Sequence, residues 1–366
     1  MAFERKYMER AIELAKKGKG SVDPNPLVGA VIVKNGKIIG EGYHHKYGDL
    51  HAERDAFASL KESAEGAELY VTMEPCCHQG KQPPCTEAIV ENKIKRVFVG
   101  SDDPNPLVSG KGIWYLREHG VEVFSHAMKD ECDEINRVFF HYITTKKPYV
   151  VLKYAMTMDG KICTRSGKSR FITNELSRNM VQEMRKELTA IMVGIGTVLY
   201  DDPQLTCRID GARNPIRIIA DSNLMIPIKS KVVQTAKQIK TFVATTEKMK
   251  EQKKDKIKRL EDLGVFILLI PEKDGHVDLS ILMEKLGIMK VNSILLEGGG
   301  TLNWGMLKEG LVQEVRTFTA PKIFGGEKAK TPVDGEGISE VDNCALGELI
   351  ELKALDKDIY ARYILK

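Results

Sequence analysis

The sequence lacks any apolar run long enough to cross a membrane. No stretch of its 366 residues approaches 18 uninterrupted apolar positions, the length at which a spanning helix becomes a candidate. The first twenty residues, MAFERKYMERAIELAKKGKG, carry charges throughout and contain no apolar segment of the kind found in signal peptides. We therefore expect no membrane association and no secretion signal.

Cysteine and net charge are also scarce. The seven cysteines are an odd number, and only Cys76, Cys77 and Cys85 cluster, which does not favour a disulfide framework. We therefore expect a reducing compartment, with the cytoplasm as the default. The net charge of +4 is too small to imply a nucleic-acid surface. It is compatible with an anionic small molecule that binds in a local pocket.

Length and pattern indicate two α/β domains. A chain of this length suits about two domains, and its 42% hydrophobic and 29% charged residues are typical of globular proteins. The segment TTKKP at 144–148 is a plausible boundary. We therefore predict domains over 1–146 and 147–366. Apolar strands alternate with helical patterns in both parts, which predicts α/β architecture.

In the first part, two apolar runs joined at Asn35-Gly36 predict a hairpin, because this dipeptide is a strong hairpin signal. We expect helices over 3–17, 51–60, 86–92 and 112–119, a further helix ending near Tyr142, and strands over 68–72, 96–100 and 121–124. In the second part we expect strands over 216–220, 241–244, 265–270 and 293–297, a helix near 177–187 and a lysine-rich helix over 246–260.

The tripeptide HAE and the stretch EPCCHQGKQPPC carry the strongest chemical signal. His51 is followed by Glu53, and by cysteines 25 and 34 residues after the histidine. Catalytic zinc takes three nitrogen or sulfur ligands from the protein and keeps the fourth position for water. One histidine and two cysteines fit that count. Glu53 then remains free to move protons to and from a water held by the metal.

The choice of cysteines follows from their positions. Adjacent cysteines are poorly placed for one tetrahedral zinc because their side chains diverge along the backbone. Cys76 follows Pro75, as in the H-x-E and P-C-x-x-C signature of zinc nucleobase deaminases. Cys85 begins an expected helix, where the N-terminus favours a thiolate. We therefore predict His51, Cys76 and Cys85 as ligands, with eight residues between the two cysteines instead of two.

A closed, structural zinc site is the alternative. It would need a fourth ligand, which His78, Cys77 or His44 could supply.

In the second part, the stretch ILLEGGGTLNWGML is the most informative. An apolar strand ends at Glu297, three glycines follow, and a helix is expected from near Leu302. Such a turn lets backbone N–H groups approach a phosphate, although an ordinary tight turn explains it equally well. It is not a G-x-G-x-x-G fingerprint, so we do not predict a Rossmann fold. Arg185 and Arg208 suit a phosphate because guanidinium is a planar fork, with a surface ion pair as the alternative for Arg185.

Several segments together resemble the bifunctional riboflavin-biosynthesis deaminase/reductase family, RibD or RibG. They are DPNPLVGAVIV, GEGYHHKYGDLHAE, TMEPCCHQGKQPPC, DPNPLVSGKG, KYAMTMDGKI, SGKSRFIT and VGIGTVLYDDPQLTCR, with the glycine-rich stretch above. This family has an extended insertion between its zinc cysteines, and a serine is usual at position 77. The resemblance implies an N-terminal cytidine-deaminase-like α/β/α sandwich and a C-terminal dihydrofolate-reductase-like α/β domain. It also implies one Zn²⁺ per chain and NADPH.

The resemblance further implies roles for individual residues. In the deaminase domain, Glu53 would be catalytic, and the substrate would contact Asn25, His44, His78 and Lys81. In the reductase domain, the substrate would contact Ser169, Arg185, Leu205, Arg208 and Glu297. NADPH would contact Met156, Phe171, where the family commonly has tryptophan, Thr197, Asp201, Ser222, Gly299, Gly300, Thr301, Leu302, Asn303, Trp304 and Gly305.

The implied function is a pair of reactions on a phosphorylated pyrimidine. The first is zinc-dependent deamination of 2,5-diamino-6-ribosylamino-4(3H)-pyrimidinone 5′-phosphate. The second is NADPH-dependent reduction of the ribosyl side chain, for which the sequence shows no obvious general acid. A homo-oligomer, either dimer or tetramer, is also implied. Two alternatives stay open: a zinc deaminase of a nucleoside, nucleotide or RNA base with an inactive second domain, and a zinc-stabilised binding protein without catalysis.

Overall fold

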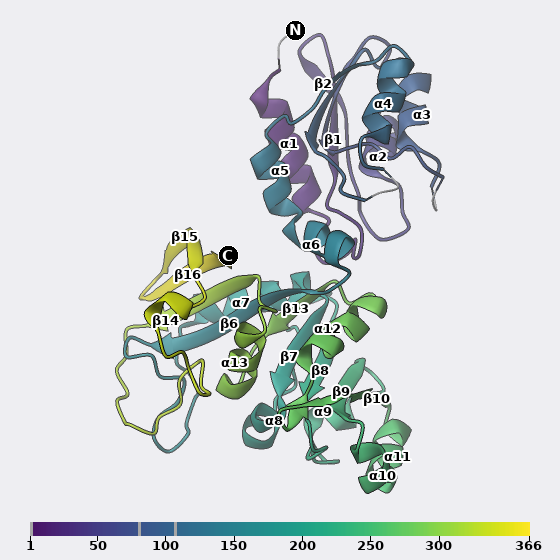
Figure 1. Cartoon of the computed structure of the whole chain (residues 1–366). Helices are drawn as coiled ribbons and strands as arrows, with labels where there is room; N and C mark the ends of the chain where they lie inside the picture. The colour runs from purple at the N-terminus through teal and green to yellow at the C-terminus, as the bar shows by residue number, and fades with distance from the viewer. Residues whose placement is uncertain (1–2, 80–81, 106–107) are drawn as a thin grey trace. The chain divides into compact units, whose positions relative to one another are not determined.

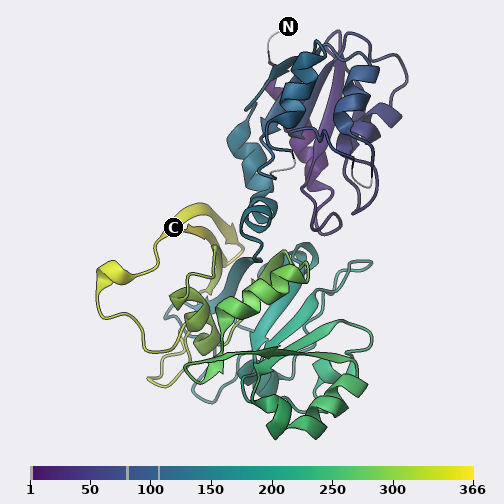
Figure 2. The same ribbon diagram turned by 45° about the vertical axis from the view of Figure 1, so that its right-hand side comes forward.

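The computed structural model describes residues 3–79, 82–105 and 108–366 (Figures 1 and 2). The chain divides into two compact units, residues 1–146 and 147–366. Each unit has a mixed α/β fold built on its own principal sheet. No helix of the described residues is long and apolar enough to cross a membrane.

The first unit is a three-layer sandwich around a sheet of strand order β2-β1-β3-β4-β5. Strands β3 to β5 are parallel, whereas β1 is antiparallel to both of its neighbours. Helices α1 and α5 cover one face and α2, α3 and α4 the other, which confirms the predicted α/β/α sandwich (Figure 1). The strands are β1 (Gly29–Lys34), β2 (Lys37–Tyr43), β3 (Glu68–Met73), β4 (Arg96–Ser101) and β5 (Glu122–Phe124); the helices are α1 (Arg5–Lys16), α2 (Ala52–Ala58), α3 (Cys85–Glu91), α4 (Lys111–Glu118), α5 (Lys129–Ile135) and α6 (Arg137–Thr145).

Local sequence explains two features of strands β1 and β2, the turn that joins them and the close approach of α2. Asn35 and Gly36 have φ angles of 51° and 74°, as a two-residue hairpin with right-handed twist requires, so the predicted hairpin is confirmed. On β2, a Cβ atom at Gly42 would approach the backbone of Ala52 and Ala56 to less than 3.0 Å. Glycine therefore lets α2, which carries Glu53, pack directly against the sheet.

The second unit contains a sheet of order β10-β9-β8-β7-β13-β6-β14-β16-β15. Along this order, neighbouring strands from β10 as far as β14 are parallel. At the remaining edge, β16 is antiparallel to β14, and β15 is antiparallel to β16. Both faces of this sheet are buried by apolar clusters, one with α12 and α13 and the other with α8 to α11. Burial on both faces is expected for parallel strands. The strands are β6 (Tyr149–Thr157), β7 (Ala190–Gly194), β8 (Ile216–Ala220), β9 (Thr241–Thr246), β10 (Val265–Ile270), β13 (Ser293–Leu296), β14 (Glu314–Ala320), β15 (Gly347–Leu355) and β16 (Asp358–Leu365).

The helices of this unit are α7 (Glu175–Glu187), α8 (Ile195–Asp201), α9 (Lys231–Gln234), α10 (Met249–Gln252), α11 (Lys254–Asp262), α12 (Leu279–Ile288) and α13 (Gly300–Lys308). A small hairpin of β11 (Glu272–Lys273) and β12 (His276–Val277) and a 3₁₀ turn, Val341–Asn343, complete the unit.

Two helices differ from expectation. The lysine-rich helix predicted over 246–260 is two helices, since Lys253 (φ −133°, ψ 35°) leaves the helical region and β9 extends to Thr246. The helix predicted to end near Tyr142 is likewise divided between α5 and α6 at Asn136. The side chain of Asn136 instead bonds the backbone N–H and C=O of Leu27, at 2.8 and 2.9 Å. That long-range contact cannot be read from helical periodicity.

Candidate functional site

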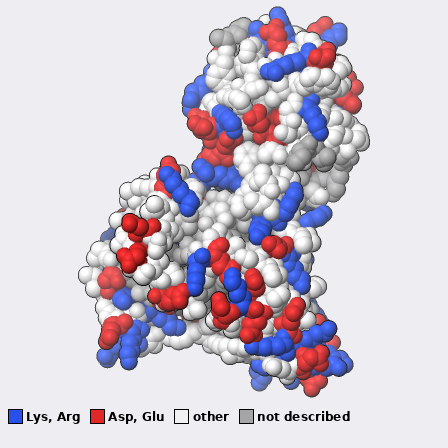
Figure 3. Space-filling model, viewed as in Figure 1, with Lys and Arg blue, Asp and Glu red and all other residues white. Residues whose placement is uncertain are grey.

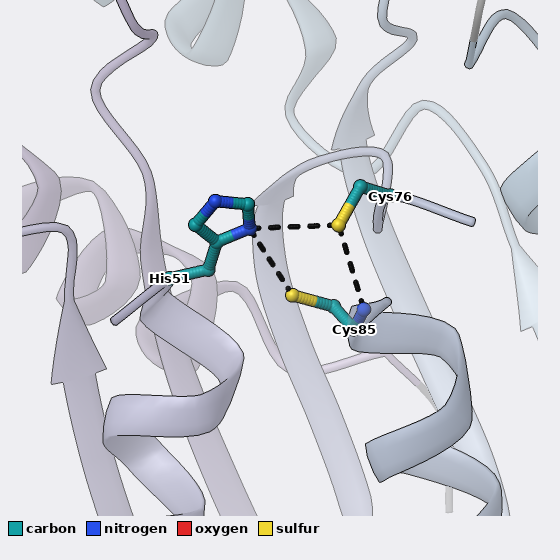
Figure 4. Close-up of side chains that lie close together, drawn as sticks. All are labelled: His51, Cys76 and Cys85. Atoms are coloured by element: carbon teal, nitrogen blue, oxygen red, sulfur yellow. Dashed lines mark hydrogen bonds between the residues drawn. The ribbon is translucent and has the colours of Figure 1, made fainter. Parts of the chain in front are cut away.

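The three predicted zinc ligands lie together (Figure 4). The Nδ1 atom of His51 is 3.5 Å from Sγ of Cys76 and 3.4 Å from Sγ of Cys85. His51 immediately precedes α2, Cys76 follows β3, and Cys85 is the first residue of α3. Three separate segments therefore present one nitrogen and two sulfur atoms to a common point.

This donor set fits a zinc ion. With Zn–N near 2.0–2.1 Å and Zn–S near 2.3 Å, tetrahedral geometry places nitrogen and sulfur about 3.5 Å apart, the separation found here. The hydrogen bond between the two thiols lowers the pKa of Cys76 and raises that of Cys85. Within the part of the chain that the structure describes, Cys77, His78 and His44 do not join the group. The set therefore has the three-ligand composition of a catalytic site rather than the four of a structural one.

Glu53 is buried beside this cluster, with 3% of its surface exposed. Burial raises the pKa of Glu53 to about 7, and the nearby Cys76 thiolate adds to the shift. A carboxyl group that titrates near neutrality can both accept and release a proton. Its position on the first turn of α2, two residues after His51, keeps it next to the metal ligands without joining them.

A cavity of about 320 Å³ opens onto the cluster and Glu53. Asn25, His44 and His78 line it, as the family resemblance implies. His78 has a buried Nδ1 atom without a hydrogen-bond partner in the described part of the chain, which leaves it available to a ligand. Both ring nitrogens of His44, by contrast, contact other residues of the protein. Lys81 lies outside the described residues.

Two acidic residues of this site were missed by the sequence-based reasoning. Asp103 lines the cavity, and burial raises the pKa of its carboxyl group to about 6. Glu74 is buried and accepts hydrogen bonds from the backbone of Gly110 and Gly112, each at 3.0 Å, where α4 begins. Both follow neighbouring parallel strands, β3 and β4, whose carboxyl ends lie at one edge of the sheet. That adjacency is the signal that could have identified them.

In the second unit, Arg185 and Glu297 form a two-point ion pair. Nε and Nη2 of Arg185 lie 3.1 and 2.7 Å from the carboxylate oxygens, and Nη1 donates to the carbonyl of Thr206. The guanidinium fork that was predicted to suit a phosphate thus holds Glu297, and Arg185 is not the surface ion pair considered as the alternative. Burial would raise the pKa of Glu297, but Arg185 and Lys153 outweigh it and hold that pKa at about 2.

Lys153, which sequence reasoning also missed, is the second cation beside Glu297. Burial lowers the pKa of its ammonium group, and the charge of Glu297 opposes this effect. Arg208 contributes a further positive charge near Glu297. The carboxyl end of β13 therefore carries one buried carboxylate among several cations. This is a setting in which an anionic substrate and a proton transfer can both be accommodated.

The glycine-rich turn after β13 fits a nucleotide cofactor. The N–H of Gly194 at the end of β7 donates to the carbonyl of Gly298 at 2.8 Å, so the turns that precede α8 and α13 lie side by side. Added Cβ atoms would meet nothing within 4 Å at Gly196, and at Gly299 nothing closer than Thr197 Oγ1 at 3.9 Å. The backbone at Gly196 and Gly299 is therefore open to a phosphate of NADPH, whereas the Asp334 carboxylate lies against Gly300.

The other implied cofactor residues are more varied. Asp201 ends α8, and Ser222, which follows β8, accepts a hydrogen bond from the N–H of Val277. Asn303 donates to the carbonyl of Pro332, and the Trp304 ring packs against Gly335. The remaining cofactor positions are Met156 at the end of β6, exposed Phe171 under the Arg178 guanidinium, and Gly300, Thr301, Leu302 and Gly305 in α13. Of the implied substrate residues, Ser169 is half-buried in a loop and Leu205 is buried.

Two aspartates have structural roles. Asp202, next to Asp201, accepts a hydrogen bond from the N–H of Lys231 at the start of α9. Asp159 lies in the turn that follows β6, where it accepts hydrogen bonds from Thr157 and from the N–H groups of Phe324 and Gly325. These hydrogen bonds, of which the one from Thr157 has the largest effect, lower the pKa of Asp159 to about 2.

Fold and site together define a zinc deaminase domain joined to an α/β reductase domain, and comparisons with known proteins agree. Residues 1–101 match the cytidine and deoxycytidylate deaminase zinc-binding region, and residues 148–361 match the RibD C-terminal domain. The chain is 50% identical over 358 residues to the riboflavin biosynthesis protein RibD of Actinobacillus pleuropneumoniae, covering 98% of this chain and 94% of the relative. It is 39% identical to RibD of Escherichia coli, with 88% of each chain covered.

Solved structures give the same result. A deaminase/reductase from Thermotoga maritima matches with a TM-score of 0.87 at 37% identity, over 99% of this chain and 98% of its own. RibD of Acinetobacter baumannii matches with a TM-score of 0.88 at 36% identity and the same coverage. The chain belongs to the RibD family, as its motifs suggested.

Proposed function

We propose that this chain catalyses two consecutive steps of riboflavin biosynthesis. Residues 1–146 deaminate 2,5-diamino-6-ribosylamino-4(3H)-pyrimidinone 5′-phosphate, and residues 147–366 reduce the ribosyl side chain of the product to ribityl with NADPH. The observation that carries the proposal is the grouping of His51, Cys76 and Cys85 at a cavity that His51, Cys76 and Glu53 line. Membership of a family that contains named deaminase/reductases supports it.

In the deaminase domain, His51, Cys76 and Cys85 would hold zinc. When bound, zinc supplies the Lewis acidity that activates water for attack on the amino-bearing carbon. Glu53 accepts the proton that water loses and delivers it to the departing ammonia, so that the C–NH₂ group becomes a carbonyl. The pKa of Glu53 near 7 suits both transfers. Asn25, His78 and Lys81 would bind the substrate.

In the reductase domain, NADPH supplies a hydride to the ribosyl carbon. The structure supports a place for the cofactor along the turns after β7 and β13, where Gly194 and Gly298 are bonded. Reduction also needs a proton. Lys153 is a buried ammonium group close to Glu297 and Arg185, and because Glu297 is held ionised, we assign proton delivery to Lys153.

A paired assay tests both activities. The zinc-loaded full chain should release ammonia from the pyrimidine phosphate, and should oxidise NADPH when it is given the deaminated sugar phosphate. A nucleoside or RNA deaminase would release ammonia only from its own substrate and leave NADPH unchanged. A binding protein would do neither.

We also propose a homo-oligomer, a dimer or tetramer, in which β15 contacts a second copy. Among the described strands β15 pairs only with β16, and Leu349 and Leu352 on it are 50% and 62% exposed. A long apolar edge strand is a template for pairing with another chain. Leu352→Glu should lower the sedimentation coefficient, whereas Ile288→Glu, at an 82% exposed position in α12, should not. A monomeric wild-type protein would contradict the assembly.

The proposed ligands are small molecules rather than nucleic acid, and the proposed location is the cytoplasm. Acidic and basic side chains are interspersed on the face shown in Figure 3, without one continuous basic stripe, whereas nucleic-acid sites concentrate positive charge. All seven cysteines are free thiols. Because Cys76 and Cys85 must stay reduced to bind zinc, a reducing compartment suits the site.

A further inference from the structure

A hydrogen-bonded chain of three residues forms part of the wall of the deaminase cavity. The Nδ1 atom of His44 is 2.9 Å from the carbonyl oxygen of Leu50, and its Nε2 atom is 3.1 Å from Nδ2 of Asn25. His44 is 3% exposed, and both His44 and Asn25 line the cavity beside Glu53. The imidazole therefore connects a backbone carbonyl to a side chain that faces the substrate space.

The chemistry of these groups fixes the direction of each bond. A carbonyl oxygen only accepts, so Nδ1 of His44 must carry the proton that faces Leu50. In the neutral ring Nε2 is then an acceptor, and only the NH₂ group of Asn25 can donate to it. The amide of Asn25 is thus held in one of its two orientations, with Oδ1 turned away from His44.

The backbone on both sides of this chain is anchored. The N–H of His44 donates to the carbonyl of Val28 at 3.0 Å, and that of Asn25 to Val22 at 2.9 Å. Two residues after Asn25, Leu27 is held at both its N–H and its C=O by the Asn136 side chain. The Asn25 loop is therefore preorganised, and flipping its amide would place two acceptors against each other.

We propose that His44 is a positioning residue that fixes Asn25 as a hydrogen-bond acceptor for an N–H group of the substrate. The proposal rests on the deamination described above and sharpens it. It replaces the implied direct contact between His44 and substrate with an indirect role. It also specifies the ligand class as an amino-substituted pyrimidine that presents a donor, rather than a ring acceptor, to Asn25.

A double-mutant cycle on the zinc-loaded full chain tests this role. Asn25→Ala should raise KM for the pyrimidine phosphate about tenfold, the loss expected for one hydrogen bond. His44→Phe keeps a ring of similar size but removes both bonds, and it should raise KM by a similar factor with little change in kcat. The double variant should match Asn25→Ala alone, because His44 acts through Asn25. Independent, multiplying effects would overturn the proposal.

Controls on the same chain distinguish failure of this proposal from loss of folding and from failure of the proposed function. Zinc content and NADPH oxidation should be unchanged in all three variants, which shows that both domains are folded. If the wild-type chain released no ammonia from the pyrimidine phosphate, the proposed function itself would fail. The double-mutant cycle would then lack a wild-type KM for comparison.

A spectroscopic measurement addresses the proposal without activity or substitution. In protein with ¹⁵N-labelled histidine rings, of which the chain has eight, His44→Phe identifies the His44 signals. The zinc-loaded wild type should show His44 as the neutral ring protonated at Nδ1. A proton on Nε2 would require the Asn25 amide to turn the other way, and would overturn the proposal even if the kinetic variants failed to fold.

Discussion

Arg185 binds the carboxylate of Glu297 through two nitrogens, at 3.1 and 2.7 Å, although the residues are 112 positions apart in the sequence. The two side chains are only 14% and 12% exposed. Arg185 comes from α7 and Glu297 follows β13. The pair therefore ties a helix to the strand end where the reductase site is proposed, and a change in either residue should affect stability and reduction together.

Glu297→Gln should destabilise the chain and abolish reduction. Removing one charge of a well-buried pair leaves Arg185 without its counter-ion, which costs about 3–5 kcal/mol. Denaturant unfolding measures that loss, and NADPH oxidation measures activity. Glu336→Gln is a matched control, because Glu336 pairs with Lys308 on the surface at 65% and 55% exposure. Such exposed pairs contribute about 0–1 kcal/mol. Equal effects of the two substitutions would contradict a special role for Glu297.

The same ion pair predicts a pH dependence of stability. The pKa of Glu297 is about 2 in the folded chain, against about 4.3 in an unfolded one. Because folding lowers this pKa, its stabilisation is complete above about pH 4.3 and is lost as the pH falls towards 2. The difference in unfolding free energy between wild type and Glu297→Gln should therefore shrink by roughly 3 kcal/mol from pH 6 to pH 2. A constant difference would show that Glu297 is not held ionised.

Glu53→Gln should separate the two activities. The amide cannot accept and return a proton, so ammonia release should fall about 10²–10⁴-fold. Zinc content should stay at one per chain, since Glu53 is not in the ligand group, and NADPH oxidation should be unchanged. Glu87→Gln, at an exposed position in α3, is the control and should retain deamination. Ammonia release near the wild-type rate in Glu53→Gln would remove this residue from the mechanism.

Serine variants of the three clustered cysteines should identify the ligands. Cys76→Ser and Cys85→Ser should lose zinc, because each removes one of three protein ligands. Cys77→Ser should keep both zinc and deamination, since Cys77 lies outside the group. Metal analysis of the purified variants measures the outcome, and loss of zinc from Cys77→Ser would overturn the choice of ligands.

Much of the fold follows from local sequence. The Asn35-Gly36 turn and the strands Ile216–Ala220 and Val265–Ile270 form where local pattern predicts them, because turn chemistry and apolar runs act over a few residues. The division between α5 and α6 does not, because Asn136 satisfies the backbone of Leu27 instead of continuing a helix. Tertiary contacts of this kind override periodicity.

The candidate site was predictable where its chemistry is local in sequence. His51 and Glu53 share one motif, and Cys76 and Cys85 share another. Glu74 and Asp103 become recognisable only when the sheet brings the ends of β3 and β4 together, and Lys153 only when β6 pairs with the end of β13. The Arg185 fork shows the same limit, because its partner Glu297 lies in a distant segment.

The most direct test of the account measures zinc together with both activities on one purified chain. We expect one zinc per chain, ammonia release from 2,5-diamino-6-ribosylamino-4(3H)-pyrimidinone 5′-phosphate, and NADPH oxidation that depends on the deaminated product. Zinc-loaded protein that neither releases ammonia from this pyrimidine phosphate nor oxidises NADPH with the deaminated sugar phosphate would contradict it.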